Sequence, residues 1–293
     1  MSSIFTLFRK QIETYHKKSQ FYSGIKSNWI LYNREPVLQA VKKSYTRRSA
    51  KCISSFDFST LYTTIPHNKL IEVLNKIINF VFKGGTRNYI AINKSGSANW
   101  VKSIKTFNTI YSKESVTEAI AYLISNCYFR LGDKLFRQDV GIPMGSDPAP
   151  AFANLFLFHY ESSWLNSMKK TNNILVRKFG QLFRYIDHLL ILNNGHSFES
   201  YHHDIYPEEL QLNKENDNNN STNILDLHIT IQTEFSQLNF LINVTILVST
   251  LPDYHTRTAI FYVECFTLAL LLNAFEYVEL HLTLLMLHCP LKH

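Results

Sequence analysis

Two aspartates stand inside segments that otherwise have the composition of buried strands. Asp57 lies at the end of Lys51–Phe58, and Asp187 lies in the middle of Leu182–Ile191. A carboxylate at such a position costs free energy unless it is paired, exposed to water or bound to a cation. The chain must therefore fold so that each of these two carboxylates meets one of those conditions.

Two interpretations of this pair remain open from the residues alone. If the two strands are neighbours, the carboxylates could hold two divalent ions through oxygen ligands. Such ions activate an attacking hydroxyl and stabilise a leaving pyrophosphate. Alternatively, each aspartate is an ordinary strand-end or turn residue that faces solvent. Either aspartate taken by itself favours this second interpretation.

Periodicity and turn residues predict helices and strands in no regular alternation, which indicates an α+β fold. Helices are predicted over Pro66–Phe82, Ser115–Cys127 and Ala149–Leu165. The first has Pro66 near its first turn, the second begins with a capping box of Ser115 and Glu118, and the third is apolar nearly all round and should be buried. Strands are predicted over Lys51–Phe58 and Ile224–Ile231, and hairpins over Tyr128–Gln138 and Leu182–Ile191. The first hairpin turns at Gly132-Asp133 and the second at Asp187-His188.

The chain has a basic excess that is unevenly distributed. Its 293 residues carry 30 Lys and Arg against 23 Asp and Glu, a formal net charge of +7. Residues 1–240 hold 28 of the basic and 19 of the acidic residues, so residues 241–293 are net negative and strongly apolar. A basic surface favours nucleic acid or another anionic partner, although an ordinary basic protein has the same balance. With 45% hydrophobic residues and few Gly and Pro, the chain is not of the disordered class.

A Gly/Pro-rich loop separates the two aspartates. Gly141–Pro150 reads GIPMGSDPAP, and its glycines allow a turn with unusual dihedral angles and a close backbone approach. The buried helix that follows would hold this turn rigidly. A plain connection between a hairpin and a helix is the alternative, because such a loop does not by itself indicate nucleotide binding.

In this order, the segments resemble a known family. FDFSTLYTTIPH, GIPMGSDPAPAFANLFLFHYE and FRYIDHLLILNN are similar to motifs A, B and C of reverse transcriptases. More narrowly, the chain resembles the reverse transcriptases of Penelope-like retroelements, which are relatives of telomerase. Further matching segments are Lys83–Arg87 (KGGTR), Asn126–Gln138, Pro207–Asn216 and Ile224–Ile231, and the resemblance covers roughly Asn28 to Phe240.

The resemblance implies a right-hand polymerase palm and fingers and a role for each matching residue. Asp57 and Asp187 match the metal ligands of motifs A and C, and the carbonyl of Phe58 could add an oxygen. Tyr62 matches the residue that packs under the incoming sugar and rejects a ribose hydroxyl; a core tyrosine is the alternative.

Three further residues match positions around the nucleotide. Met144 and Gly145 match the turn that lies against the nucleotide and the template base. Lys214 matches the lysine that protonates or neutralises the leaving pyrophosphate. A solvated loop lysine is the alternative interpretation of Lys214.

One departure from the family falls in motif C. The family has a second aspartate where this chain has His188. Mg²⁺, the cofactor that the resemblance implies, prefers oxygen, so we expect weakened binding of one ion and a large loss of activity. A histidine adapted to Mn²⁺ is the alternative.

The ends of the chain also depart from the family. The resemblance implies three parts: residues 1–50 as a partial fingers segment, 51–240 as fingers and palm, and 241–293 as an apolar tail in place of a native thumb. The abrupt change near residue 240 is typical of a reading-frame shift, and a genuine apolar anchor is the alternative. Ala259–Phe275 has only 17 residues and contains Glu264, so we do not expect it to associate with a membrane.

Two functions remain open from the sequence. One is an RNA-directed DNA polymerase that uses an RNA template, a DNA primer and deoxynucleoside triphosphates, with no obligate protein partner indicated. The other is a catalytically inactive retroelement remnant that binds nucleic acid without sequence specificity. The four cysteines form no CxxC pair, which favours a reducing compartment, nuclear or cytoplasmic.

Overall fold

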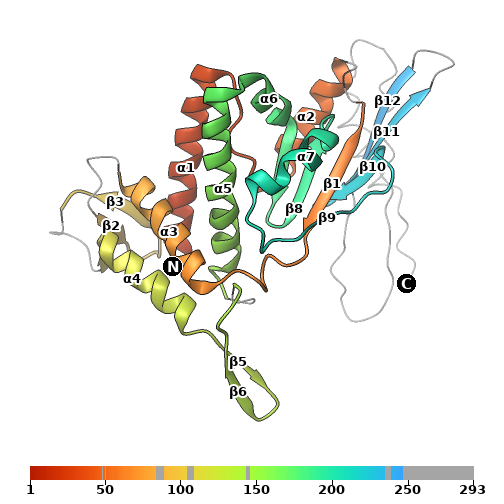
Figure 1. Ribbon diagram of the computed structural model, residues 1–293. Helices are drawn as coiled ribbons and strands as arrows, with labels where there is room; N and C mark the ends of the chain where they lie inside the picture. Colours follow the sequence, from red (N-terminus) through yellow and green to blue (C-terminus); the bar gives the residue numbers. More distant parts are fainter. Residues whose placement is uncertain are drawn as a thin grey trace, which may run out of the picture.

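The computed structural model describes residues 1–47, 49, 51–83, 89–103, 109–142, 146–234 and 239–246. A four-stranded sheet with the order β7-β8-β1-β9 lies at its centre (Figure 1). The strands are β1 (Ile53–Phe58), β7 (Leu182–Tyr185), β8 (His188–Leu192) and β9 (Leu212–Lys214). Every pairing within this sheet is antiparallel, and β1 is flanked on both sides.

Helices α5 (Ala149–Thr171) and α7 (Gly195–Ile205) cover one face of this sheet. Successive side chains of a strand point to opposite faces, and Phe56 and Phe58 of β1 point toward these helices. The Phe56 ring lies 5.1 Å from the ring of Phe198 on α7, and the Phe58 ring lies 4.8 Å from that of Tyr206. Gly195 allows α7 to approach β1 closely, since a Cβ there would lie 2.1 Å from Ser54 Oγ.

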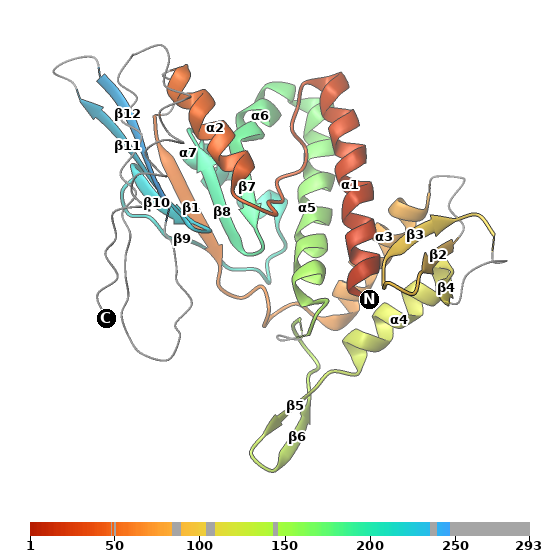
Figure 2. The ribbon, with the colours of Figure 1, turned by 180° about the vertical axis from the view of Figure 1, so that it is seen from behind.

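A second layer covers the opposite face (Figure 2). It consists of α2 (Glu35–Thr46) and a three-stranded sheet of β10 (Ser221–Ile224), β11 (Leu227–Glu234) and β12 (Asn239–Ile246). The apolar side chains buried between the two layers include Val37, Val41, Ile53, Leu190, Leu192, Leu227 and Ile229. The central sheet is thus buried on both faces over most of its length.

The rest of the described chain is mainly helical. Helix α1 (Ser2–Ser23) runs beside α5, with the Phe5 and Phe152 rings 5.3 Å apart. The remaining elements are α3 (His67–Phe82), α4 (Lys113–Ser125), α6 (Asn173–Lys178) and a sheet with the order β3-β2-β4, formed by β2 (Tyr89–Ile92), β3 (Ala98–Val101) and β4 (Thr109–Tyr111). A short 3₁₀ helix, Phe179–Gln181, leads into β7.

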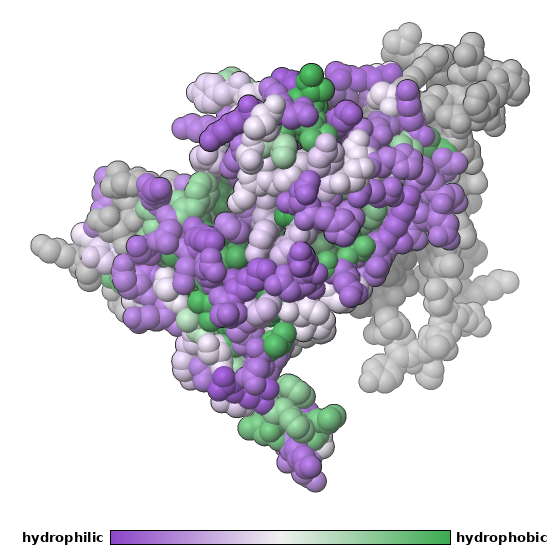
Figure 3. Space-filling model, in the orientation of Figure 1, coloured by the Kyte–Doolittle hydropathy of each residue, from purple (hydrophilic) through white to green (hydrophobic). Residues whose placement is uncertain are grey.

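The hairpin of β5 (Tyr128–Leu131) and β6 (Lys134–Arg137) projects away from the body of the protein (Figure 1). Both strands are exposed along their whole length, and Leu131 and Leu135 are each 69% exposed. The space-filling view shows hydrophobic residues gathered on this projection (Figure 3). Its turn falls at Gly132-Asp133, as the sequence predicted, and Gly132 has φ of 61°.

Several sequence-based elements are confirmed and others need correction. The strand predicted over Lys51–Phe58 is present as β1, which begins at Ile53, and Pro66 is the N-cap of α3. Helix α4 begins earlier than predicted, because the side chain of Ser112, not Ser115, caps it and accepts from the Ser115 N–H. The predicted strand Ile224–Ile231 is divided by a two-residue turn, since Ile224 pairs with Leu227 and Leu225 has φ of 53°.

The boundary expected at residue 240 falls inside β12. This strand pairs with β11 from Asn239 to Ile246, and Ile242 is buried between the layers. Residues 247–293, which include most of the expected tail, lie outside the described residues. Within the described part of the chain, no helix combines the length and the apolar character that crossing a membrane requires.

His16 is a titratable group in the contact between α1 and α5. Its side chain is 6% exposed, its Nδ1 lies 2.7 Å from Ser27 Oγ, and its ring packs 5.2 Å from that of Phe158. Burial, assisted by the charge of Lys169, lowers the pKa of His16 to about 4. The folded protein therefore binds a proton at His16 less readily than the unfolded chain does.

We predict that the free energy of unfolding falls by about 2 kcal/mol between pH 7 and pH 5 because of His16. The pKa is lower in the folded state, so stability is lost as the pH falls below about 6.5, toward 4. His16→Gln should flatten this part of the profile in urea unfolding experiments. The exposed His196→Gln control should keep it, and a slope unchanged by His16→Gln would contradict the prediction.

Candidate functional site

The two aspartates lie at the same end of the central sheet. Asp57 is near the end of β1, and Asp187 is in the two-residue turn between β7 and β8, in which Tyr185 pairs with His188. The turn thus consists of Ile186 and Asp187, which corrects the sequence-based position by one residue. His188 is the first residue of β8 and lies directly opposite Asp57.

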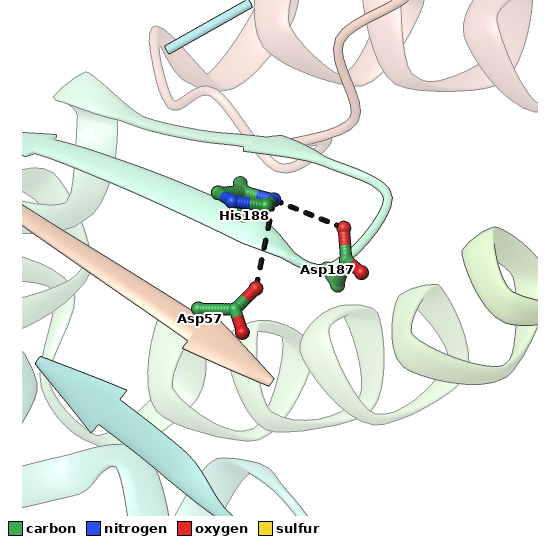
Figure 4. A group of neighbouring side chains, drawn as sticks. All are labelled: Asp57, Asp187 and His188. Atoms are coloured by element: carbon green, nitrogen blue, oxygen red, sulfur yellow. Dashed lines mark hydrogen bonds and ion pairs between the residues drawn. The ribbon is translucent and has the colours of Figure 1, made fainter. Parts of the chain in front are cut away.

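Three side chains converge at this end of the sheet (Figure 4). One potential ligand atom each from Asp57, Asp187 and His188 lies within 4.8 Å of the others. His188 Nδ1 is 3.0 Å from Asp187 Oδ1 and 3.5 Å from Asp57 Oδ1. The side chains of Asp57, Asp187 and His188 are 28%, 30% and 45% exposed, respectively, so the cluster is open to solvent.

A fourth group, Glu215, completes the surroundings of the imidazole. Its Oε1 lies 3.5 Å from His188 Nε2, on the side of the ring that faces away from the aspartates. Sequence reasoning did not identify Glu215. Its position depends on the register of β9 against β1, where Asn213 pairs with Asp57, and no local pattern in the sequence specifies that register.

The charges in the cluster shift one another's ionisation. The hydrogen bond with Asp187, together with the charges of Glu215 and Asp57, raises the pKa of His188 to about 9. Burial raises the pKa of Asp57, and the His188 imidazole offsets this only in part. Burial is the largest single influence on Asp187 and acts to raise its pKa. The hydrogen bond with His188, a backbone hydrogen bond and the charges of His188 and Arg184 together outweigh burial and hold that pKa below its usual value.

A buried ion pair lies beneath the turn that carries Asp187. Arg184 of β7 donates to Glu161 of α5 through Nε at 2.5 Å and through Nη2 at 3.1 Å, and neither side chain is more than 2% exposed. The hydroxyl of Tyr206 donates to the same carboxylate at 3.0 Å. The carboxylate of Glu161 is therefore fully engaged, as a buried charge must be.

Arg184 also fixes the backbone of the turn itself. Its Nη1 donates to the carbonyl of Ile186 at 2.9 Å and to Asn154 Oδ1 at 2.8 Å. Ile186 has φ of 54°, which is strained for a β-branched residue. The Phe58 N–H donates to the carbonyl of Asp187 at 3.2 Å and ties the turn to β1. The strained conformation of Ile186 is thus maintained by hydrogen bonds from β7 and from β1.

Phe58 follows Asp57 directly, and Tyr62 contacts the start of the Gly/Pro-rich loop through its backbone. Phe58 is buried, whereas Tyr62 is half-buried, and burial together with the nearby charge of Asp187 raises the pKa of Tyr62 to about 12. The N–H of Ile142 donates to the Tyr62 carbonyl at 2.9 Å, and the N–H of Gly141 donates to the Ile65 carbonyl at 2.8 Å. The loop therefore begins directly against the turn that carries Tyr62. Met144 and Gly145 lie outside the described residues.

Lys214 is not brought into the cluster. It pairs with Phe56, so its side chain lies on the face of the sheet opposite to that of Asp57. There its Nζ forms an ion pair with Glu199 of α7 at 2.9 Å. The catalytic role expected for Lys214 stays a prediction.

Comparison with known proteins shows a similarity of fold. No protein-family model and no curated protein matches the sequence. Among solved structures, telomerase from Candida albicans in complex with the TWJ fragment of telomeric RNA matches with a TM-score of 0.51 and 11% identity, over 78% of this chain. The fold is similar to that of telomerase, a reverse transcriptase.

This chain matches only part of the longer telomerase chain. The chain spans 38% of the length of the Candida albicans telomerase chain. Apo telomerase from Candida tropicalis matches with a TM-score of 0.49 and 14% identity, over 77% of this chain and 38% of that chain. The Candida albicans match confirms, for the fold alone, the expected mixture of helices and strands similar to that of a reverse transcriptase.

We predict that Gly141→Ala destabilises the protein by about 2 kcal/mol or more. Gly141 has φ of +91°, and a Cβ there would lie 2.3 Å from the Tyr62 carbonyl oxygen. Gly180→Ala is the matched control, since a Cβ at Gly180 has nothing within 4 Å. Thermal unfolding of both variants measures the difference, and equal midpoints would contradict the prediction.

We also predict that Arg184→Met destabilises the protein by about 3–5 kcal/mol, because it leaves the Glu161 charge buried without its partner. Arg184→Met combined with Glu161→Leu should recover most of this loss. Lys76→Met, which breaks the exposed pair of Lys76 with Glu72, should change stability by less than about 1 kcal/mol. Urea unfolding compares the variants, and a loss at Arg184 as small as that at Lys76 would show that the pair is not important.

Proposed function

We propose that this chain is a reverse-transcriptase module, an RNA-directed DNA polymerase by descent. One observation carries the proposal: Asp57 and Asp187 converge at one end of a sheet in a protein whose fold is similar to that of telomerase. Within reverse transcriptases we assign it to the Penelope-like group, on the ordered motifs that include Gly141–Pro150. Its substrates would be a DNA primer, an RNA template and deoxynucleoside triphosphates.

The donor set fits a divalent cation. Asp57 and Asp187 offer carboxylate oxygens, the ligands that Mg²⁺ and Mn²⁺ prefer, in a position open to solvent. A bound ion would supply Lewis-acid stabilisation of the charge that develops on the reacting phosphate. The central sheet is assigned to the polymerase palm, and the backbone hydrogen bond between Phe58 and Asp187 keeps the two strands in register.

Tyr62 is the residue we assign to contact with the sugar of the nucleotide. It is half-buried, and its hydroxyl is close enough to Asp187 for that charge to raise its pKa. The attachment of Ile142 to the Tyr62 carbonyl places the start of the Gly/Pro-rich loop beside it. A role for Lys214 in protonating the leaving group would require it to leave Glu199 and reach the other face of the sheet.

A second candidate function is favoured by His188. Where a second aspartate is expected, this chain has an imidazole that contacts both remaining carboxylates. It removes one anionic ligand and weakens the hold on two closely spaced cations. The second candidate is therefore a module that binds nucleic acid without turnover. The structural neighbour from Candida albicans is in complex with RNA, which supports nucleic-acid binding in either case.

Primer extension on poly(rA)/oligo(dT) tests the proposal. We predict that His188→Asp raises the extension rate with Mg²⁺ by at least about tenfold, because it restores a hard oxygen ligand. Asp57→Asn in that background should abolish the gain, and the exposed His196→Asp control should leave the rate of the parent chain unchanged.

Nucleic-acid binding separates the two candidates. Binding of the primer–template by the parent chain should weaken steeply with salt, because phosphate contacts release counterions. If folded His188→Asp protein binds the primer–template but extends no primer with Mg²⁺ or Mn²⁺, the binding module is the better function. If neither protein binds at low salt, both candidates are wrong.

A further inference from the structure

His188 Nδ1 lies close to a carboxylate oxygen of each aspartate. It lies 3.0 Å from Asp187 Oδ1 and 3.5 Å from Asp57 Oδ1. Two ligand atoms on adjacent positions of one metal ion, each bound at about 2.0–2.2 Å, are themselves about 3–3.5 Å apart. The two distances from Nδ1 match this spacing, and one ligand atom from each of the three residues lies within 4.8 Å of the others (Figure 4).

Glu215 supplies an independent reason to see His188 as a ligand. Metal-binding histidines commonly direct their second ring nitrogen to a carboxylate, which fixes the tautomer and the orientation of the ring. Glu215 Oε1 lies 3.5 Å from His188 Nε2, on the side away from the aspartates. In this structure Nδ1 donates to Asp187 Oδ1 at 3.0 Å. An ion bound at Nδ1 would displace that proton, since metal ligands must be deprotonated, while Glu215 would keep the proton on Nε2.

This donor set is unusual within the protein. Among the described residues, no second group of three His, Cys, Asp or Glu ligand atoms converges in this way. His196, for example, contacts a single carboxylate, that of Glu199, and its side chain is 83% exposed. Convergence of three ligands is therefore specific to the end of the central sheet.

The mixture of ligands selects among ions. Mg²⁺ requires nearly ideal octahedral oxygen coordination and loses its waters reluctantly, so a nitrogen ligand adds little for it. Imidazole suits Zn²⁺ and the other late first-row ions, whose affinity for mixed nitrogen and oxygen sites is also higher in general. Replacing an aspartate by His188 therefore disfavours the ion that a reverse transcriptase uses and favours a different class of ion.

We infer that Asp57, Asp187 and His188 form a mixed oxygen and nitrogen site for a single late transition-metal ion, Zn²⁺ or its substitute Co²⁺, in preference to Mg²⁺. This inference deepens the proposed function, because it concerns the same site. It also predicts weaker binding of Mg²⁺, since an ion held through His188 would occupy both carboxylates and compete with Mg²⁺ for them.

Calorimetric titration of the full chain with Zn²⁺ and with Mg²⁺ tests the inference. We expect one Zn²⁺ per chain, bound at least about 100-fold more tightly than Mg²⁺. His188→Ala should lower the Zn²⁺ affinity at least about tenfold without lowering that for Mg²⁺. Glu215→Gln should lower the Zn²⁺ affinity about 10–100-fold while leaving the fold intact by circular dichroism. The His196→Ala control should bind Zn²⁺ as the parent chain does.

Co²⁺ provides a direct view of the ligand. The Co²⁺-loaded parent chain should show a strongly shifted imidazole N–H resonance in the proton spectrum, which His188→Ala removes and His196→Ala retains. A Zn²⁺ affinity that His188→Ala leaves unchanged, or a shifted resonance that persists in that variant, would overturn the inference.

These readouts do not depend on polymerase activity. If the parent chain binds Zn²⁺ through His188 but the His188→Asp variant extends no primer, the result would support the metal site and contradict the proposed polymerase function. If the His188→Asp variant extends primers but the parent chain shows no preference for Zn²⁺, the result would support the polymerase function and contradict the metal-site inference.

Discussion

The buried ion pair between Arg184 and Glu161 is the interaction on which the geometry of the site depends. It joins β7 to α5, engages the hydroxyl of Tyr206, and places a guanidinium N–H on the carbonyl of Ile186. A charge pair removed from water is stable only when its remaining hydrogen-bonding groups are also satisfied, and these partners satisfy them. The strained turn that presents Asp187 is therefore held by the core beneath it.

The same turn places His188 opposite Asp57. The imidazole of His188 is surrounded by carboxylates at this end of the sheet. Three carboxylates, those of Asp57, Asp187 and Glu215, lie within 3.5 Å of the imidazole. They favour its charged form and raise its pKa to about 9. An imidazole, which can carry a proton or bind a metal ion through nitrogen, thus contacts both aspartates at this end of the sheet.

The likeness to telomerase concerns the fold, whereas His188 concerns the chemistry of the site. The fold depends on apolar layers on both faces of the central sheet, which tolerate a polar exchange at its open end. Activity depends on the charge and hardness of a few side chains at that end. A fold similar to that of telomerase therefore does not determine the ion preference of the site.

The sequence by itself determined α3, whose apolar residues recur with a helical period, and α5, which is apolar nearly all round. It also determined β1 and the β7–β8 hairpin, each with one aspartate. It missed α1, although Ile4, Phe8 and Ile12 recur there with a helical spacing. It also could not place Lys214 and Glu215. Their faces follow from the pairing of β9 with β1, and a shift of one residue in register exchanges the two faces of a strand. Only tertiary structure decided that register, since the hydrogen bonds that set it join residues more than 150 positions apart along the chain.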